Sequence, residues 1–437
     1  MTKITIIGAG SVVFTRTLGG DIMLSPELAG SVIALTDIDE GRLETARKML
    51  ERMASTLNSD VTIETYMDRR KALRGSKYVI TTFQQGGLLA YRHDLEIPQK
   101  YGVDQAVGDT LGPGGVFRGL RTIPVLIDIC RDMEEVCPDA LLMNYVNPMA
   151  IITWAVNKAT SIKMIGLCHS VQGTSEDIAG YCGVPCEEVS YTAAGINHMS
   201  WFLDLKWKGQ DLYPKLCEAM SDPVVYQKDM IKFEVLKTFK YFVTESSYHF
   251  SEYVPYYRRS QEMIEKIGKI DSWLKKWNGR CFDFASDRQD EYYDKLLRQI
   301  DGKEDMEIKR SHEYGCEIIK AMETGKAFRV NGNVMNKGFI TNLPNDCCVE
   351  VPCLVEKDVI RPCYVGDLPP QLAALDRSNI NVQELAVQAA LTGDREAAVM
   401  AITLDPLTAA SISPVQIEKM VNEMFDAEIG YLPQFRS

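Results

Sequence analysis

Short apolar runs alternate with helix-like apolar spacing over about the first 170 residues of the chain. The runs predict strands at 3–7, 31–36, 62–66, 78–82, 141–145 and 163–167. Between them, apolar residues recur every three or four positions, as from Leu43 to Leu57 and from Ile123 to Met133. This alternation is typical of a parallel sheet covered by helices, so we expect an α/β fold.

The second half of the chain has a different pattern. An apolar run from Trp201 to Leu205 precedes an aromatic-rich stretch of helix formers, about 225–315, which predicts a helical insertion. Short strands are expected at 328–330, 338–341 and 349–351, followed by helical spacing from Asn381 to Phe425. We therefore expect two domains, 1–195 and 196–437, of which the second is mixed α+β.

Composition narrows the class of partner. The 437 residues include 60 acidic and 48 basic side chains, and the resulting net charge of −12 repels nucleic acids and anionic lipid surfaces. No signal peptide or membrane span is recognisable, and the 12 cysteines never form a Cys-x-x-Cys motif. We therefore expect a cytoplasmic protein with reduced thiols that binds a small molecule, with no nucleic-acid or membrane partner.

A dinucleotide motif lies at the N-terminus. Gly8, Gly10 and Ser11 fall between the first strand and the first helix, where bare backbone at a helix N-terminus can bind a pyrophosphate. Val13 replaces the third glycine of the usual motif, and a plain strand-to-helix turn is the alternative. Asp37 ends the second strand, where a carboxylate binds ribose hydroxyls and repels a 2′-phosphate, which favours NAD over NADP. Asp39 is the alternative if the register differs.

Polar residues also follow later strands. The glycine-rich segment 108–115, ahead of Arg118, is either a lid over a bound substrate or an ordinary surface loop that caps the next helix. Asn147 ends the fifth strand, where it is either a turn former or a contact to a sugar hydroxyl or to the nicotinamide ribose. Cys168 and His198 each follow strand-like runs. They can bind a divalent transition metal, although single cysteines and histidines are more often buried core residues.

The segment Tyr241–Tyr253 concentrates aromatic and titratable side chains. It predicts either an amphipathic packing surface or a sugar-binding wall with acid and base groups.

Taken together and in this order, these motifs resemble the NAD-dependent glycosidases of glycoside hydrolase family 4 over nearly the whole chain. The segments that carry the resemblance are Gly8-Ala9-Gly10-Ser11, Gly108-Asp109-Thr110, Arg118-Gly119-Leu120-Arg121, Tyr145-Val146-Asn147-Pro148-Met149, Gly166-Leu167-Cys168-His169-Ser170 and Gly195-Ile196-Asn197-His198. Within that family, Cys168-His169-Ser170 looks like the α-galactosidase (melibiase) branch.

The resemblance implies a Rossmann-type domain related to lactate and malate dehydrogenases, with NAD and a divalent metal, usually Mn²⁺. Its implied reaction oxidises carbon 3 of the sugar, eliminates the glycosidic oxygen, adds water and reduces carbon 3 again. By resemblance, the metal ligands are Cys168 and His198, and Asn147 is a substrate contact. We also expect Arg118 and Asp109 to contact the substrate.

We propose His169 as the acid that protonates the leaving group and Tyr241 as the base at carbon 2. The expected activity is hydrolysis of α-galactosides by a homodimer or homotetramer. An α-glucosidase, an α-glucuronidase or an α-galacturonidase of the same family remains possible, as do a 2-hydroxyacid dehydrogenase and a non-enzymatic NAD-binding regulator.

Overall fold

The computed structural model describes residues 1–270, 274–277 and 280–435. Its strands form a single mixed sheet. The strands of the first half are β1 (Lys3–Ile7), β2 (Val32–Thr36), β3 (Thr62–Tyr66), β4 (Tyr78–Thr81), β5 (Leu141–Asn144) and β6 (Met164–Gly166). Each of the six predicted strands is confirmed to within two residues at either end.

The first six strands are parallel and lie in the order β3-β2-β1-β4-β5-β6, which is the Rossmann order. Apart from the edge strand β3, they are largely apolar because both faces are covered: Ile4 and Ile6 of β1 and Ile33 and Leu35 of β2 have no exposed surface. The helices α1 (Val12–Met23) and α2 (Glu40–Leu57) pack on each other beside this sheet. Parallel strands with this order present all their carboxyl ends at one edge.

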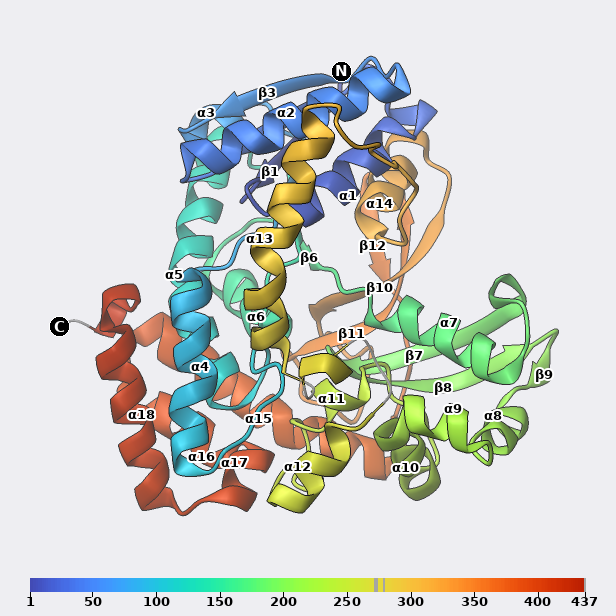
Figure 1. Cartoon of the computed structure of the whole chain (residues 1–437), viewed down its shortest axis with the longest axis vertical. Coiled ribbons are helices and arrows are strands. Elements are labelled where there is room, and N and C mark those ends of the chain that lie inside the picture. The colour runs from blue at the N-terminus through green and yellow to red at the C-terminus, as the bar shows by residue number, and fades with distance from the viewer. Residues whose placement is uncertain (271–273, 278–279, 436–437) are drawn as a thin grey trace.

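The sheet continues into the second half through antiparallel pairs, β6-β10-β11-β7-β8-β9, with β12 paired to β11 (Figure 1). These strands are β7 (Val189–Ile196), β8 (Met199–Trp207), β9 (Gln210–Asp211), β10 (Phe328–Met335), β11 (Cys348–Glu356) and β12 (Val359–Pro362). The expected domain boundary, between 195 and 196, thus falls inside β7. Because one sheet spans both halves, the metal candidates near β6 and β7 belong to one continuous scaffold.

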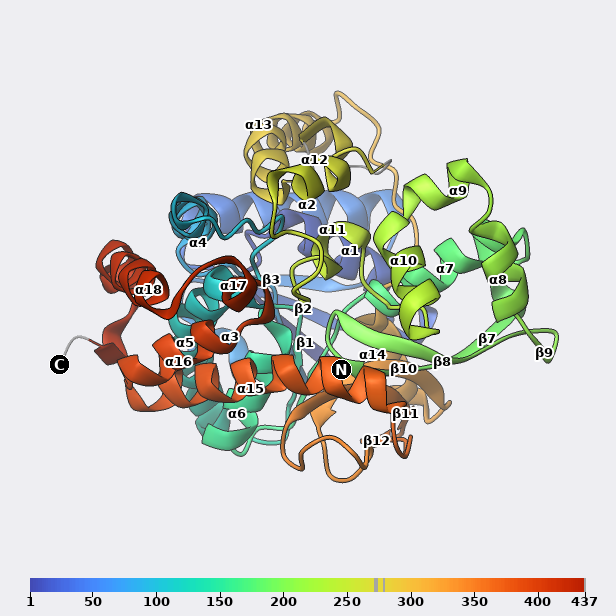
Figure 2. The same cartoon turned by 90° about the horizontal axis from the view of Figure 1, so that it is seen from below.

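Helices surround the sheet (Figure 2). In the first half they also include α3 (Arg69–Leu73), α4 (Gly87–Tyr101), α5 (Gly112–Val136), α6 (Met149–Ala159) and α7 (Ser170–Cys182). In the second half they are α8 (Tyr213–Ala219), α9 (Pro223–Lys228), α10 (Met230–Phe239), α11 (Ser247–Phe250), α12 (Gln261–Ile267), α13 (Cys281–Ile300), α14 (Tyr314–Thr324), α15 (Pro370–Thr392), α16 (Arg395–Leu404), α17 (Pro406–Ser411) and α18 (Pro414–Glu428). Within the described residues, none of these helices could cross a membrane.

Second-half helices pack directly on the first half. Helix α13 lies across α2 and α4, and α15 packs against α5 and α6 (Figure 1). A buried ion network adds to this packing: Arg121 of α5 donates to both carboxylate oxygens of Asp94 in α4 and, at 3.0 Å, to Glu428 of α18. All three side chains have no exposed surface. Such a network fixes helix positions because removal of one partner leaves a buried charge uncompensated.

Most of the predicted second-half pattern is confirmed, with one correction. The expected helical insertion at 225–315 contains α9 to α13, apart from 271–273 and 278–279, which lie outside the described residues. The expected strand at 338–341 is wrong, since only Ile340 forms an isolated bridge, with Gly366. The Asn336 side chain accepts from the backbone N–H of Ile340 and donates to its carbonyl, so these backbone groups are satisfied without a sheet ladder.

The glycine-rich segment 108–115 is also different from an exposed loop. Gly112, Gly114 and Gly115 are buried in the first turn of α5. A Cβ on Gly115 would lie 2.3 Å from the carbonyl carbon of Thr110, so the glycines permit close packing of the loop on the helix. The segment is therefore a fixed, close-packed turn.

Candidate active site

The predicted site residues of the first half meet at the carboxyl edge of the parallel sheet. Gly8 follows β1, Asp37 follows β2 and Cys168 follows β6, while Asn147 lies three residues beyond the end of β5. Since neighbouring parallel strands end side by side, residues far apart in the chain are brought to one crevice. Sequence spacing had placed Asn147 at the end of β5 itself, and the difference is a short turn after Asn144.

The glycine motif and Asp37 are in direct contact. The backbone N–H of Gly10 donates to Asp37 Oδ2 at 2.7 Å. Gly8 has a φ of 85°, and a Cβ there would lie 2.6 Å from the Cβ of Phe83. Helix α1 has no side-chain cap and no acidic residue in its first turn, so its N-terminal amides are available to an anionic group. This geometry fits a pyrophosphate.

The alternatives Asp39 and Val13 have other environments. Asp39 caps α2 by accepting from the backbone N–H of Arg42 at 3.0 Å. Val13 is 53% exposed, so its side chain does not obstruct the packing of α1 on the sheet, which is the usual reason for a third glycine.

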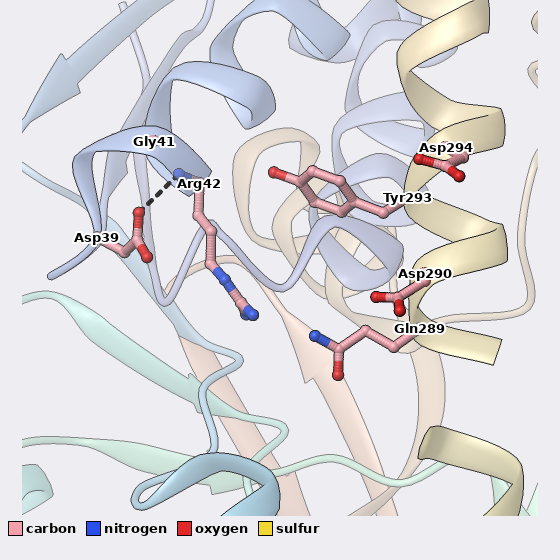
Figure 3. A pocket seen from close by; sticks show the side chains of 7 residues that line it. All are labelled: Asp39, Gly41, Arg42, Gln289, Asp290, Tyr293 and Asp294. Atoms are coloured by element: carbon pink, nitrogen blue, oxygen red, sulfur yellow. Dashed lines mark hydrogen bonds between the residues drawn. The ribbon is translucent and has the colours of Figure 1, made fainter. Parts of the chain in front are cut away.

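A cavity of about 660 Å³ lies beyond Asp37, between the start of α2 and helix α13 (Figure 3). Asp39, Gly41 and Arg42 line one wall, and Gln289, Asp290, Tyr293 and Asp294 of α13 line the other. The Tyr293 hydroxyl donates to Thr45 Oγ1 of α2 at 2.9 Å, which holds the two walls together. Arg42 links the cavity to the glycine motif, since a Cβ on Gly10 would lie 2.7 Å from the Cβ of Arg42, so the adenosine end of a dinucleotide would lie here.

The two predicted metal ligands are adjacent. His198 occupies the two-residue turn between β7 and β8, with a φ of 63°, an uncommon conformation for a residue with a side chain. Its Nε2 lies 3.2 Å from Cys168 Sγ and 3.5 Å from Glu245 Oε2. Because these atoms come from three separate segments, the fold positions them from different sides.

The other nitrogen of His198 is held by one residue from each half of the chain. Its Nδ1 lies 3.1 Å from Thr110 Oγ1 and 3.2 Å from the Tyr253 hydroxyl, which also lies 2.8 Å from His249 Nε2. His249 Nε2 in turn lies 3.3 Å from Asp109 Oδ1. These contacts fix the ring of His198 and direct its Nε2 toward Cys168.

The charges of this cluster depend on each other. Burial alone would lower the pKa of His198, but Cys168 and Glu245 raise it from 6.5 to about 10. Burial likewise opposes the ionisation of Glu245 and Asp109. The neighbouring His198 and His249 nevertheless hold the pKa of Glu245 below its usual value. His249 does the same for the pKa of Asp109. The pKa of His249 is raised, against burial, by its bond to Asp109. The acidic side chains around His198 and His249 therefore favour a positive charge at this site.

The donor set fits a divalent transition metal. A sulfur and an imidazole nitrogen 3.2 Å apart are within the roughly 3–4 Å that separates two ligands of one ion. Ligand atoms of Asp109, His198 and His249 also lie within 4.8 Å of one another. Both polar atoms of the Asn197 side chain are buried without a hydrogen-bond partner, next to His198. The site thus offers both ligands and unpaired polar groups.

Metal affinity at this site is expected to rise with pH. An imidazole binds metal in its neutral form, and with a pKa of about 10 His198 must release a proton to do so. The association constant for Mn²⁺ should therefore increase, by up to about tenfold per pH unit, between pH 6 and 8. Titration calorimetry in two buffers with different ionisation enthalpies measures the protons released. An affinity independent of pH would contradict this charge assignment.

The remaining predicted residues lie at different depths. Asn147 donates to Asp109 Oδ2 at 2.9 Å, so the two expected substrate contacts are joined. Arg118 is 9% exposed, donates to Gln84 and lies over the Tyr91 ring. His169 is the residue before α7, with a side chain 66% exposed and 3.5 Å from Glu313.

Tyr241 is half-buried beside Tyr213, with ring centroids 6.1 Å apart. None of the hydrogen bonds or ring contacts found among the described residues joins it to the cluster around His198. Sequence reasoning singled out the segment Tyr241–Tyr253 but no other single residue in it. The structure shows that Glu245, His249 and Tyr253 of this segment reach the cluster. Their spacing of four residues was the available signal, because such spacing places side chains together in a helix, although α11 itself covers only Ser247–Phe250.

Comparison with known families covers almost the whole chain. Residues 3–184 match the model of family 4 glycosyl hydrolases, and residues 193–408 match the model of the C-terminal domain of the same family. An alpha-galactosidase of Bacillus subtilis is 44% identical over the full length of both chains. An alpha-galactosidase of Rhizobium meliloti is 39% identical over 99% of this chain and 89% of its own.

Solved structures show the same fold. A 6-phospho-beta glucosidase from Thermotoga maritima, solved with manganese, NAD⁺ and glucose-6-phosphate, superposes with a TM-score of 0.82 at 23% identity. The alignment covers 98% of this chain and 99% of that one. The likeness confirms that both halves share one architecture with that enzyme.

Proposed function

Because the chain belongs to the family 4 glycosyl hydrolases, we propose that it hydrolyses α-galactosides with NAD and a divalent metal, Mn²⁺ in the first instance. The observation that carries the proposal is the contact between Cys168 and His198 at the sheet edge that also holds the glycine motif and Asp37. The identity to two alpha-galactosidases supports the choice of sugar. A 2-hydroxyacid dehydrogenase has no use for a cysteine–histidine metal site at this position.

Each group has a defined place in this proposal. When bound, NAD⁺ supplies a hydride acceptor for carbon 3 of the sugar and the metal supplies a Lewis acid that acidifies carbon 2. Cys168 and His198 hold the metal, and Thr110 and Tyr253 orient His198. Asp109 and Asn147, already bonded to each other, present a carboxylate and an amide to the sugar hydroxyls.

The cofactor is proposed to lie along the first two strands. Gly8, Gly10 and Ser11 would let the pyrophosphate approach the backbone at the uncapped N-terminus of α1, and the carboxylate of Asp37 would bind the ribose. The adenine then enters the cavity between α2 and α13, where the Arg42 guanidinium offers a stacking partner. Arg118, which is buried over Tyr91, is proposed to reach the substrate from the wall formed by α5.

The proton-transfer groups are proposed as follows. His169 is exposed at the mouth of the site, where an imidazole beside the Glu313 carboxylate can donate to a leaving group. Tyr241 stays the proposed base at carbon 2. The contacts also support Glu245 in that role, because its carboxylate lies 3.5 Å from the metal-side nitrogen of His198.

The sugar is tested with a panel of nitrophenyl α-glycosides assayed with NAD⁺, Mn²⁺ and a reductant. We expect the α-galactoside to have the largest kcat/KM, ahead of the α-glucoside, the α-glucuronide and the α-galacturonide. The β-galactoside is the matched control. A larger kcat/KM for a uronide would replace the proposed sugar but keep the reaction class. Absence of hydrolysis on every glycoside would remove the proposal and leave a non-enzymatic NAD-binding protein.

Two further expectations concern the whole protein. We propose a homodimer or homotetramer, which light scattering coupled to size exclusion would measure directly. We also propose a cytoplasmic location, which agrees with 12 cysteines that are all unpaired. Cell fractionation would test it.

A further inference from the structure

Glu252 is a buried carboxylate that the proposed reaction does not use. Its side chain lies just beyond α11, and the residue is 3% exposed. Oε1 accepts from the backbone N–H groups of Ala106 and Val107, at 2.8 and 2.6 Å. Oε2 accepts from the backbone N–H of Gly108 at 2.9 Å and from Gln105 at 3.3 Å. All four donors belong to consecutive residues of one loop.

That loop leads directly to the site. Residues 103–111 form no helix or strand, and the amides of Ala106, Val107 and Gly108 bond to the Glu252 side chain in place of a backbone carbonyl. Asp109 and Thr110 follow Gly108 and contact His249 and His198 respectively. The position of Asp109 relative to the cluster is therefore set by the loop that Glu252 holds.

The other end of the loop is fixed to α5. Gln105 donates to the carbonyl of Leu111 at 2.9 Å and accepts from the backbone N–H of Gly114 at 3.1 Å. Gly108 has a φ of 60°, and its carbonyl lies so near α5 that a Cβ on Gly114 would be 2.6 Å away. The loop is thus held by α5 from the first half and by Glu252 from the second. Two of its carbonyls also accept hydrogen bonds, that of Val107 from the Tyr91 hydroxyl and that of Ala106 from the Cys281 amide.

The segment 249–253 links the loop and the cluster. His249 and Tyr253 reach the cluster, and Glu252, between them, binds the loop. A few residues beyond, Arg258 donates to the carbonyl of Asp104 at 2.9 Å and pairs with its carboxylate. One stretch of the second half therefore sets both the histidine and the carboxylate that faces it.

We propose that Glu252 is a positioning residue that holds Asp109 against His249 and Asn147 through the loop amides of residues 106–108. The inference deepens the proposed function and, for its kinetic readout, rests on it. It assigns to the second half of the chain the placement of a substrate-contacting residue of the first half.

The test is a double-mutant cycle between Glu252→Gln and Asp109→Asn. In Glu252→Gln an amide NH₂ faces the Gly108 N–H, so one support of the loop is lost. We expect kcat/KM to fall about 10–100-fold in Glu252→Gln, the usual cost of an outer-shell partner, with NAD affinity unchanged. The double variant should be no worse than Asp109→Asn alone, because both changes act through one residue.

Glu134→Gln is the matched control. Its carboxylate also accepts a loop amide, from Ser161 at 2.7 Å, but at the far end of α5. It should retain full activity. Glu252→Asp keeps a carboxylate acceptor on a shorter side chain and should recover part of the lost kcat/KM. It also replaces Glu252→Gln as the test variant if that variant does not fold.

Hydrogen exchange of residues 103–110 gives a readout without turnover. It should accelerate in Glu252→Gln and stay unchanged in Glu134→Gln. Additive losses in the cycle, or unchanged exchange of this loop, would overturn the proposal. A wild-type protein inactive on all glycosides would count against the proposed function, while the exchange measurement would still decide whether Glu252 holds the loop.

Discussion

Replacing His198 with Ala is expected to lower kcat/KM for an α-galactoside by about 10³-fold or more, since a Lewis-acid metal contributes several kcal/mol to catalysis. Cys168→Ser should have a similar effect, because a hydroxyl is a much poorer ligand than a thiolate for a transition metal. Mn²⁺ binding, measured by the loss of the free-ion electron paramagnetic resonance signal, should weaken in parallel. NAD binding should be retained, because Asp37 and the glycine motif are unchanged.

Two variants control for the loss of a cysteine or histidine as such. Cys217 is exposed, and the His312 side chain is 75% exposed and pairs with Glu176 away from the cluster. Cys217→Ser and His312→Ala should keep wild-type activity and Mn²⁺ affinity. Full activity in His198→Ala would show that the metal is not held where Cys168 and His198 meet.

Removal of bound NAD is expected to abolish hydrolysis, and addition of NAD⁺ should restore it without net formation of NADH. The reason is that a hydride taken from carbon 3 must return before the product leaves, so the overall reaction is not a redox change. Absorbance at 340 nm during turnover, alongside nitrophenol release, measures both. Hydrolysis by NAD-free protein would point to the two-carboxylate chemistry of other glycosidases. Steady NADH formation from a hydroxy acid would instead support a dehydrogenase.

The same reaction in D₂O tests proton removal at carbon 2, and variants of the two candidate bases separate them. Removal of the proton at carbon 2 should leave deuterium there in the released galactose. If Tyr241 is the base, Tyr241→Phe should lose activity and show a larger isotope effect with substrate deuterated at carbon 2. If Glu245 is the base, Glu245→Gln should lose activity and show the larger isotope effect, while Tyr241→Phe should keep wild-type activity.

Local sequence predicted the first half of the fold closely. The strands β1, β2, β4, β5 and β6 are largely apolar and buried, and that composition marks them as central strands of a covered parallel sheet. The edge strand β3, with the sequence TIETY, is more polar and partly exposed. The expected strand at 338–341 was wrong because of a nearby polar side chain: Asn336, four residues earlier, bonds to the backbone N–H and carbonyl of Ile340. A pattern of apolar residues does not show that a side chain will replace the backbone hydrogen bonds of a strand.

The sequence alone determined the parallel sheet, the glycine motif with its acidic partner, and the pair Cys168 and His198, since each depends on residue types at fixed places beside strands. The tertiary structure decided what surrounds that pair. Glu245, His249 and Tyr253 reach it only because the second half of the chain folds back onto the carboxyl edge of the sheet. Spacing along a chain specifies contacts within an element, whereas contacts between distant elements follow from packing.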